Sequence, residues 1–312
     1  MIIIVLTNTF NQKHVIGSLR RLKVAEEKII AEGGTLSYRG LFWKIIVLVL
    51  ILTGGEIIMM VYYMLTTNYM ASLSPLGAIS SWFWIFYPIT LTSLARLWFI
   101  ALMAIPEMFF DAINSILTTT GDALEALEEF PARKLTKEPI FNEFLGQKLL
   151  RMCQLHGEVG KISLAINHVF HVENLLANIF TILLTVTLMY FIYLAALNQQ
   201  IPPLFRSVDN MTLSVFYVIF GLWKVFYVIF VASEVKRKAQ LTGSCLHQIA
   251  VAVDEVPCYR LINQLSIQIW QQRLEFPVGG FFLLDMSTIG AFSGAILVYV
   301  IILIQFNLAG GT

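Results

Sequence analysis

Long apolar runs alternate with polar connectors along the whole chain. Five runs are long enough to cross a hydrocarbon core of about 30 Å as helices. We place these spans at residues 41–65, 80–104, 169–197, 211–232 and 286–306. None shows the strict alternation of apolar and polar residues that marks the strands of a membrane β-barrel. The pattern therefore predicts an all-α protein, a polytopic transmembrane bundle of five helices.

The polar connectors carry a helical pattern of their own. Apolar residues recur every three or four positions in 109–129, 143–166 and 261–274. A helix with one apolar face must bury that face against something. The pattern fits packing within one subunit and equally an anchor domain shared between subunits.

These patterns divide the chain into seven parts. They are a helical segment at 1–40, spans one and two at 41–104, a helical anchor at 105–168, spans three and four at 169–232, anchor helices at 233–285, the last span at 286–306 and a tail at 307–312.

Lys and Arg are distributed very unevenly between the two sides of these spans. Eighteen lie before span one, in the two long connectors or just inside the first span, whereas Arg206 is alone on the other side. Segments rich in Lys and Arg remain in the cytosol. We therefore expect a cytosolic N-terminus, cytosolic connectors and an extracellular C-terminus. Asn210 begins an Asn-Met-Thr glycosylation sequon on the side that we place outside.

Composition sets the class and excludes others. The chain is 57% hydrophobic with a mean hydropathy of +0.75, and only 13% is charged. Soluble domains have about 25% charged residues, so this is an integral membrane protein. The net charge of +1 and the lack of a basic stripe argue against a nucleic-acid partner.

The sequence lacks the usual motifs of metalloproteases, P-loop enzymes and serine hydrolases. We expect no catalytic residue and no cofactor. His168 and His171 are spaced to share a metal, but no Cys or carboxylate continues their helical face one turn before or after them, so we predict no metal site.

Three charges lie inside the spans, at Glu56, Arg96 and Lys224. Each costs roughly 2.5–3.5 kcal/mol or more at mid-helix unless it reaches water. We expect Arg96 and Lys224 to extend their long side chains to the cytosolic boundary. A depth difference of roughly 8 Å argues against their pairing directly with Glu56. Glu56 then faces either a water-filled cavity or a hydrogen-bonding partner.

Aromatic side chains crowd the predicted outer halves of spans one to four. A tyrosine hydroxyl at that depth needs a polar partner, and pockets in helix bundles are mostly aromatic with a few polar groups. We therefore expect a small-molecule pocket there. Its candidate lining residues are Glu56, Tyr62, Tyr87 and Tyr190.

The last span, 286–306, has no formal charge and carries small residues in its first half. Small residues let helix backbones approach closely in a membrane. On a helix, Gln305 shares a face with Ile302 and Val298. This face becomes bulkier toward the C-terminus, as in a pore that closes by dewetting. Tyr299 lies off the face and is expected to pack against a neighbouring helix. The alternative is a simple anchor helix with Gln305 at the headgroup boundary.

The sequence of this span resembles a known signature. Val298-Tyr299, five apolar residues and Gln305-Phe306 resemble the C-terminal motif of insect gustatory receptors, with Val298 where that family usually has Thr. The Gly280-Phe281-Phe282 run with Asp285 is similar to that family's approach to its last helix.

The resemblance implies a seven-helix receptor whose last five helices are represented here. The first two would be missing, either by truncation or in a divergent short receptor. It implies a homo- or hetero-tetramer in the plasma membrane, surrounded by lipid. It also implies that a small-molecule tastant opens this tetramer as a cation channel without strong selectivity. It also places the gate at Gln305 and Phe306. The alternative is a non-conducting membrane protein, such as a truncated receptor or one like a transporter or a seven-helix signalling receptor.

Overall fold

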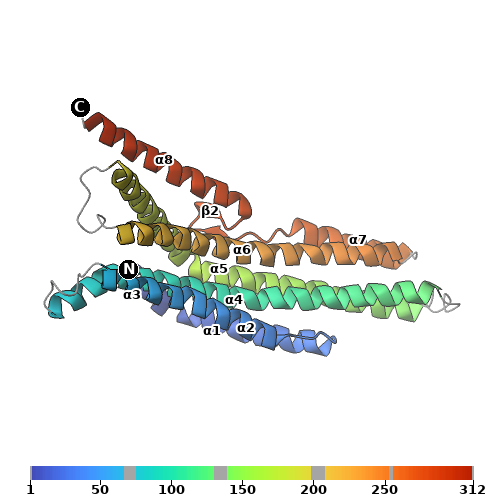
Figure 1. Ribbon diagram of the computed structural model, residues 1–312. Helices are drawn as coiled ribbons and strands as arrows, with labels where there is room; N and C mark the ends of the chain where they lie inside the picture. The colour runs from blue at the N-terminus through green and yellow to red at the C-terminus, as the bar shows by residue number, and fades with distance from the viewer. Residues whose placement is uncertain (1, 67–74, 130–138, 198–207, 253–255, 311–312) are drawn as a thin grey trace.

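The computed structural model describes residues 2–66, 75–129, 139–197, 208–252 and 256–310, with side chains for 13–62, 87–126, 141–197, 211–249 and 259–309. This part of the chain is almost entirely helical (Figure 1). Its elements are α1 (Ile2–Ala31), α2 (Tyr38–Val49), the π-helical turn η1 (Leu50–Gly54), α3 (Gly55–Thr66), α4 (Pro75–Glu129), α5 (Pro139–Ala196), α6 (Val208–Ala252), α7 (Val256–Gln271), β1 (Pro277–Val278), β2 (Phe282–Leu283) and α8 (Met286–Gly310).

The predicted helical membrane fold is confirmed. In the described residues five helices are long and apolar enough to cross a membrane, within 38–62, 87–126, 141–196, 211–249 and 286–309. Figure 1 shows α4, α5 and α6 running side by side along the molecule, with α1 and α2 along one side and α7 beside α6. The central three helices therefore form the framework on which the others pack.

In α4, α5 and α6 a span and part of the neighbouring connector form one continuous helix. The stretches 109–129 and 143–166, where the sequence predicts helix, are the continuations of α4 and α5 beyond their most apolar parts. Pro88 and Pro106 both lie inside α4 without ending it. Neighbouring helices in a bundle tolerate such prolines because they help to satisfy the freed backbone groups.

One apolar core extends along the bundle from the membrane helices into their continuations. Phe99 of α4 meets Phe170 of α5 edge to face at 6.0 Å between ring centroids. Further along, Phe110 and Leu149 are fully buried in the same core. Ile29 brings α1 into it as well. The described parts of α1, α4 and α5 thus share one core.

A short hairpin leads into the last helix. Pro277–Val278 pairs with Phe282–Leu283, and the turn between them places Gly279 and Gly280 at positive φ (57° and 76°). At Gly279 a Cβ atom would come within 2.6 Å of Leu175, so glycine is also required by the close approach to α5. Asn167 of α5 donates a hydrogen bond to the Pro277 carbonyl at 2.8 Å. The hairpin is thereby fixed against α5.

The last helix, α8, meets the bundle along one face. Ile296 and Val300 pack against Val186 of α5. Figure 1 shows α8 diverging from the bundle toward the C-terminus. At its start, Asp285 forms an ion pair with Lys236 of α6 at 2.6 Å. The hydrogen bond from Lys236 holds the pKa of the Asp285 carboxyl below its ordinary value.

Candidate functional site

Three polar side chains from three helices meet in the core of the membrane part. Lys224 Nζ of α6 lies 2.7 Å from Glu56 Oε1 of α3 and 3.0 Å from Ser93 Oγ of α4. Ser93 donates to the same carboxylate oxygen. The side chains of Glu56 and Lys224 are each only 7% exposed. We call this arrangement the core ion pair; it ties α3, α4 and α6 together away from water.

Gly55 allows the close helix approach that this pair requires. A Cβ atom at position 55 would lie 3.0 Å from the ring of Phe220, one helical turn before Lys224 on α6. The Lys224 ammonium in turn lies 4.9 Å from the centroid of the Phe220 ring. The aromatic face therefore contributes a cation–π contact to the buried ammonium.

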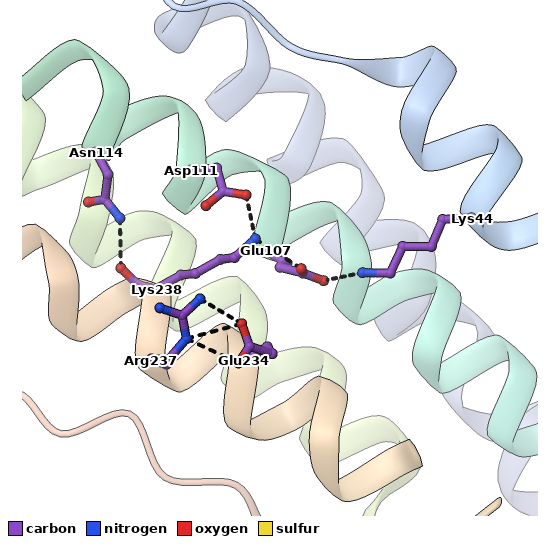
Figure 2. Close-up of polar contacts among 7 residues, drawn as sticks. All are labelled: Lys44, Glu107, Asp111, Asn114, Glu234, Arg237 and Lys238. Atoms are coloured by element: carbon purple, nitrogen blue, oxygen red, sulfur yellow. Dashed lines mark hydrogen bonds and ion pairs between the residues drawn. The ribbon is translucent and has the colours of Figure 1, made fainter. Parts of the chain in front are cut away.

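A second group of charges links α2, α4 and α6 farther along the bundle. Glu107 of α4 accepts hydrogen bonds from Lys44 of α2 at 2.8 Å and from Lys238 of α6 at 3.0 Å (Figure 2). Lys238 also pairs with Asp111, one turn after Glu107 on α4. We call these four residues the inner charge cluster.

The prediction that Lys224 extends to the boundary without pairing with Glu56 is wrong. Lys44 and Lys238 share one level because both bind Glu107. Counted from that level, Glu56 is twelve residues away along its helix and Lys224 is fourteen. The two side chains therefore differ in depth by two residues, which is about 3 Å of helical rise. The span ends taken from hydropathy suggest a difference of roughly 8 Å. The long side chain of Lys224 can reach across this small difference in depth.

The prediction that Arg96 reaches the boundary is wrong as well. Arg96 is 1% exposed. Its Nη2 donates to the Ala177 carbonyl at 2.8 Å, to Thr181 Oγ1 at 2.7 Å and to Asn178 Oδ1 at 3.3 Å, all on α5. Because α5 offers three acceptors at the depth of the guanidinium, Arg96 has no need to extend to water.

A small cavity adjoins the core ion pair. It has a volume of about 60 Å³ and is lined by Thr53, Glu56, Ile57, Met60, Ile89, Thr90 and Tyr217. Glu56 Oε2 is buried and has no hydrogen-bond partner among the described residues. The cavity holds about two water molecules at about 30 Å³ each. It is much smaller than a typical ligand pocket of about 300–1,000 Å³.

Of the predicted pocket residues, only Glu56 lines this cavity. Tyr62 is exposed, Tyr87 and Tyr190 are half-buried, and Tyr217 of α6 lines the cavity instead. Side chains at 63–86 and 198–210, which include much of the predicted outer half and Asn210, lie outside the described part. The four-residue pocket and the glycosylation of Asn210 stay predictions.

The predicted gate residues all face away from their own chain. Val298, Ile302 and Gln305 are exposed, and Phe306 is 72% exposed. Tyr299 is more than half exposed, so nothing in the described part of the chain covers it. Cβ atoms at Gly290 and Gly294 would meet nothing within 4 Å. The single chain therefore leaves an apolar face of α8, with open positions at its glycines, uncovered.

The sequence pattern of the 7tm chemosensory receptor family matches residues 1–310. The gustatory receptor for bitter taste 66a of Drosophila melanogaster is 32% identical over 200 residues. That match includes 62% of this chain and 38% of the receptor, so the matched region spans well under half of the length of this relative.

Two solved structures share the fold. The insect olfactory receptor OR5 from Machilis hrabei matches with a TM-score of 0.68 and 14% identity, over 97% of this chain and 77% of that one. The same receptor in complex with eugenol matches with a TM-score of 0.54 and 15% identity, over 95% of this chain and 70% of that one. At this level of identity the likeness concerns the fold alone.

The five apolar helices, their continuous core and the buried ion pair define a multi-pass membrane protein with the architecture of insect receptor proteins. The chain belongs to the 7tm chemosensory receptor family, which confirms the resemblance to insect gustatory receptors. Membership places the protein, as a multi-pass protein, in the plasma membrane.

Proposed function

We propose that the protein is a subunit of a tastant-gated, non-selective cation channel. The observation that carries this proposal is the uncovered face of α8. An apolar helix could expose such a face to lipid, but this face carries the exposed amide of Gln305. Polar side chains facing hydrocarbon are costly. A water-filled axis, lined by the same helix from several subunits, would accommodate them.

The small residues of α8 support assembly around such an axis. Gly290 and Gly294 leave room for a second helix to approach closely, as at helix interfaces in membranes. A tetramer of this chain, or of this chain with related receptors, would bring one α8 per subunit to the centre. The exposed apolar residues of the anchor helices, such as Phe144 and Trp270, would then contact other subunits below the membrane.

A ligand pocket among the helices around Glu56 fits the same function. The small cavity at Glu56 provides a polar point between α3, α4 and α6. The relative from Drosophila is named for bitter taste, and the OR5 receptor was solved with eugenol. We infer that a small-molecule tastant occupies or enlarges this region, with Tyr62, Tyr87 and Tyr190 at its margin. Bitter compounds are the first tastants to test.

We expect bitter tastants to evoke an inward current in cells that express the protein at their surface. The reversal potential should stay near 0 mV when Na⁺ replaces K⁺ outside, because the pore does not strongly distinguish them. Two-electrode voltage clamp of injected oocytes measures this directly.

Tyr62→Phe, Tyr87→Phe and Tyr190→Phe remove only a hydroxyl group. Loss of one hydrogen bond should shift the half-maximal tastant concentration by roughly threefold to tenfold.

Tyr259→Phe on α7 is the matched control, since Tyr259 is an exposed tyrosine far from the proposed pocket. Its dose–response curve should equal that of the unchanged protein. Surface protein that gives no current with any tastant, and migrates as a monomer after cross-linking, would favour the non-conducting alternative. Currents that none of the three pocket variants alters would move the pocket elsewhere.

The proposed channel has its N-terminus in the cytosol, because eighteen Lys and Arg residues lie on that side against Arg206 on the other. An epitope tag placed after Thr312 should stain on intact cells, and a tag before Met1 only after permeabilisation. Flow cytometry of both tagged proteins measures the two signals. The reverse staining pattern would contradict the orientation and place the anchor helices outside.

A further inference from the structure

A second cavity, much larger than the one at Glu56, lies among the continuations of the long helices. It is an open groove of about 590 Å³ between α5 and the neighbouring parts of α4, α6 and α7. His156, Gly157 and Gly160 of α5 belong to its lining, with Lys161 and Arg273 at its edge. We call it the anchor groove. Its volume is within the range of about 300–1,000 Å³ that is typical of small-molecule sites.

The buried side of the groove holds an unsatisfied hydrogen-bond acceptor. His156 is 5% exposed and packs against the ring of Phe110 at 5.1 Å between centroids. Its Nε2 lies 3.0 Å from the Ala239 carbonyl. A carbonyl oxygen only accepts, so Nε2 carries the proton, and in the neutral ring Nδ1 is left as an acceptor. Within the described part of the chain, Nδ1 is buried without a hydrogen-bond partner. A buried acceptor without a partner costs free energy unless a bound molecule supplies one.

Two cationic side chains at the edge of the groove have no ion-pair partner among the described residues. Among the described residues Lys161 and Arg273 form no ion pair. The carboxylate that lines the groove, Glu158, already binds Lys28 at 2.6 Å. The groove therefore combines two available cations with one buried acceptor.

We propose that the anchor groove binds a hydroxylated organic phosphate. The phosphate contacts Lys161 and Arg273, since a guanidinium matches two phosphate oxygens at once. A hydroxyl of the same molecule donates to His156 Nδ1. A metal ion is a poorer occupant, because within the described part of the chain no three His, Cys, Asp or Glu side chains gather.

The groove is separate from the proposed tastant pocket. Phe110 and Ala239, which contact His156, adjoin Asp111 and Lys238 of the inner charge cluster in the sequence. The groove therefore lies near the level of that cluster, whereas the Glu56 cavity lies three to four helical turns away. A phosphate in the groove would be a regulator that acts on the anchor helices. It could come from a lipid headgroup or from a free cytosolic molecule.

The test is binding to the purified full-length protein in nanodiscs, which requires no channel current. Inositol 1,4,5-trisphosphate is the free probe, and discs with or without phosphatidylinositol 4,5-bisphosphate supply the lipid form. We expect saturable binding of at least one form. The double variant Lys161→Gln, Arg273→Gln should weaken it by roughly a hundredfold, because each charge-assisted contact contributes about tenfold or more. Binding of the free probe alone identifies a soluble ligand, and binding only in lipid-containing discs identifies a headgroup.

Gly157→Leu blocks the groove without threatening the fold. A Cβ atom at position 157 meets nothing within 4 Å, and leucine favours helix over glycine. This variant should keep its thermal stability and lose binding. Lys148→Gln removes a cation from α5 outside the groove and should bind as the unchanged protein does. Absence of saturable binding of both probe forms, or binding that Gly157→Leu and the double variant leave intact, would overturn the proposal.

Discussion

Replacing Lys224 by methionine lowers the free energy of unfolding by about 3–5 kcal/mol, the usual effect of leaving one member of a buried ion pair without its partner. The Glu56 side chain is 7% exposed in the unchanged protein, and the substitution leaves Ser93 as its remaining hydrogen-bond donor among the described residues. The expected result is a clearly lower melting temperature of the detergent-solubilised receptor. Size-exclusion chromatography with fluorescence detection after stepwise heating measures the folded fraction.

Two companion variants separate the charge effect from a loss of packing. In Glu56→Gln, Lys224→Met both charges are gone, and stability should return most of the way, because neutral residues of similar size often replace a buried pair without loss. Lys28→Met breaks the exposed pair with Glu158, whose side chains are 49% and 45% exposed. That change should cost no more than about 1 kcal/mol. A double variant as unstable as Lys224→Met would show that the ion pair is not what holds these helices.

The class of protein and its helices follow from the sequence because they depend on local properties. Apolar length fixes where a helix can cross the membrane, and the recurrence of apolar residues in the connectors fixes their helical form. The signature from Val298 to Phe306 identifies the family because its residues are contiguous on one helix. None of these features requires knowledge of how two helices are placed against each other.

The contacts between helices could not be predicted in the same way. The pairing of Glu56 with Lys224 depends on the relative level of two helices, and hydropathy does not mark that level when helices continue beyond the membrane. The common reference level comes from the ion pairs of Glu107 with Lys44 and Lys238, which only the structure shows. Arg96 is satisfied partly by a backbone carbonyl of α5, which no sequence pattern displays.

The π-helical turn illustrates the same limit. The sequence shows Gly54-Gly55 in the middle of the first span, which is a plausible place for irregular backbone. The structure has the π-helical turn at Leu50–Gly54, where Thr53 Oγ1 donates to the Val49 carbonyl at 2.5 Å. Such turns often occur at functional sites. Thr53 also lines the cavity at Glu56, so the irregular turn and the candidate site coincide.

Gln305→Ala or Phe306→Ala raises the basal current of the proposed channel. Both side chains are exposed in the single chain, and in the proposed assembly they close the outer end of the pore. Removing about 1–2 kcal/mol of closing contact changes the ratio of closed to open channels roughly 5–30-fold. Current without tastant, normalised to surface protein, measures this change. Leu297→Ala removes an exposed apolar side chain beside the predicted stripe and should leave the basal current unchanged.

Tyr299→Ala distinguishes a gate from a packing position on the same helix. Tyr299 lies off the face that carries Val298, Ile302 and Gln305, and its exposed ring is expected to contact a neighbouring subunit. Its loss should lower the amount of assembled receptor at the surface and leave the conductance of the remaining channels as it was. Aromatic contacts contribute about 0.5–1.5 kcal/mol beyond their buried area, enough to weaken assembly without abolishing it.

If Gln305→Ala and Phe306→Ala leave leak, selectivity and conductance unchanged at normal surface levels, α8 is not the gate. Its uncovered face is then a surface for lipid or for a partner that does not conduct.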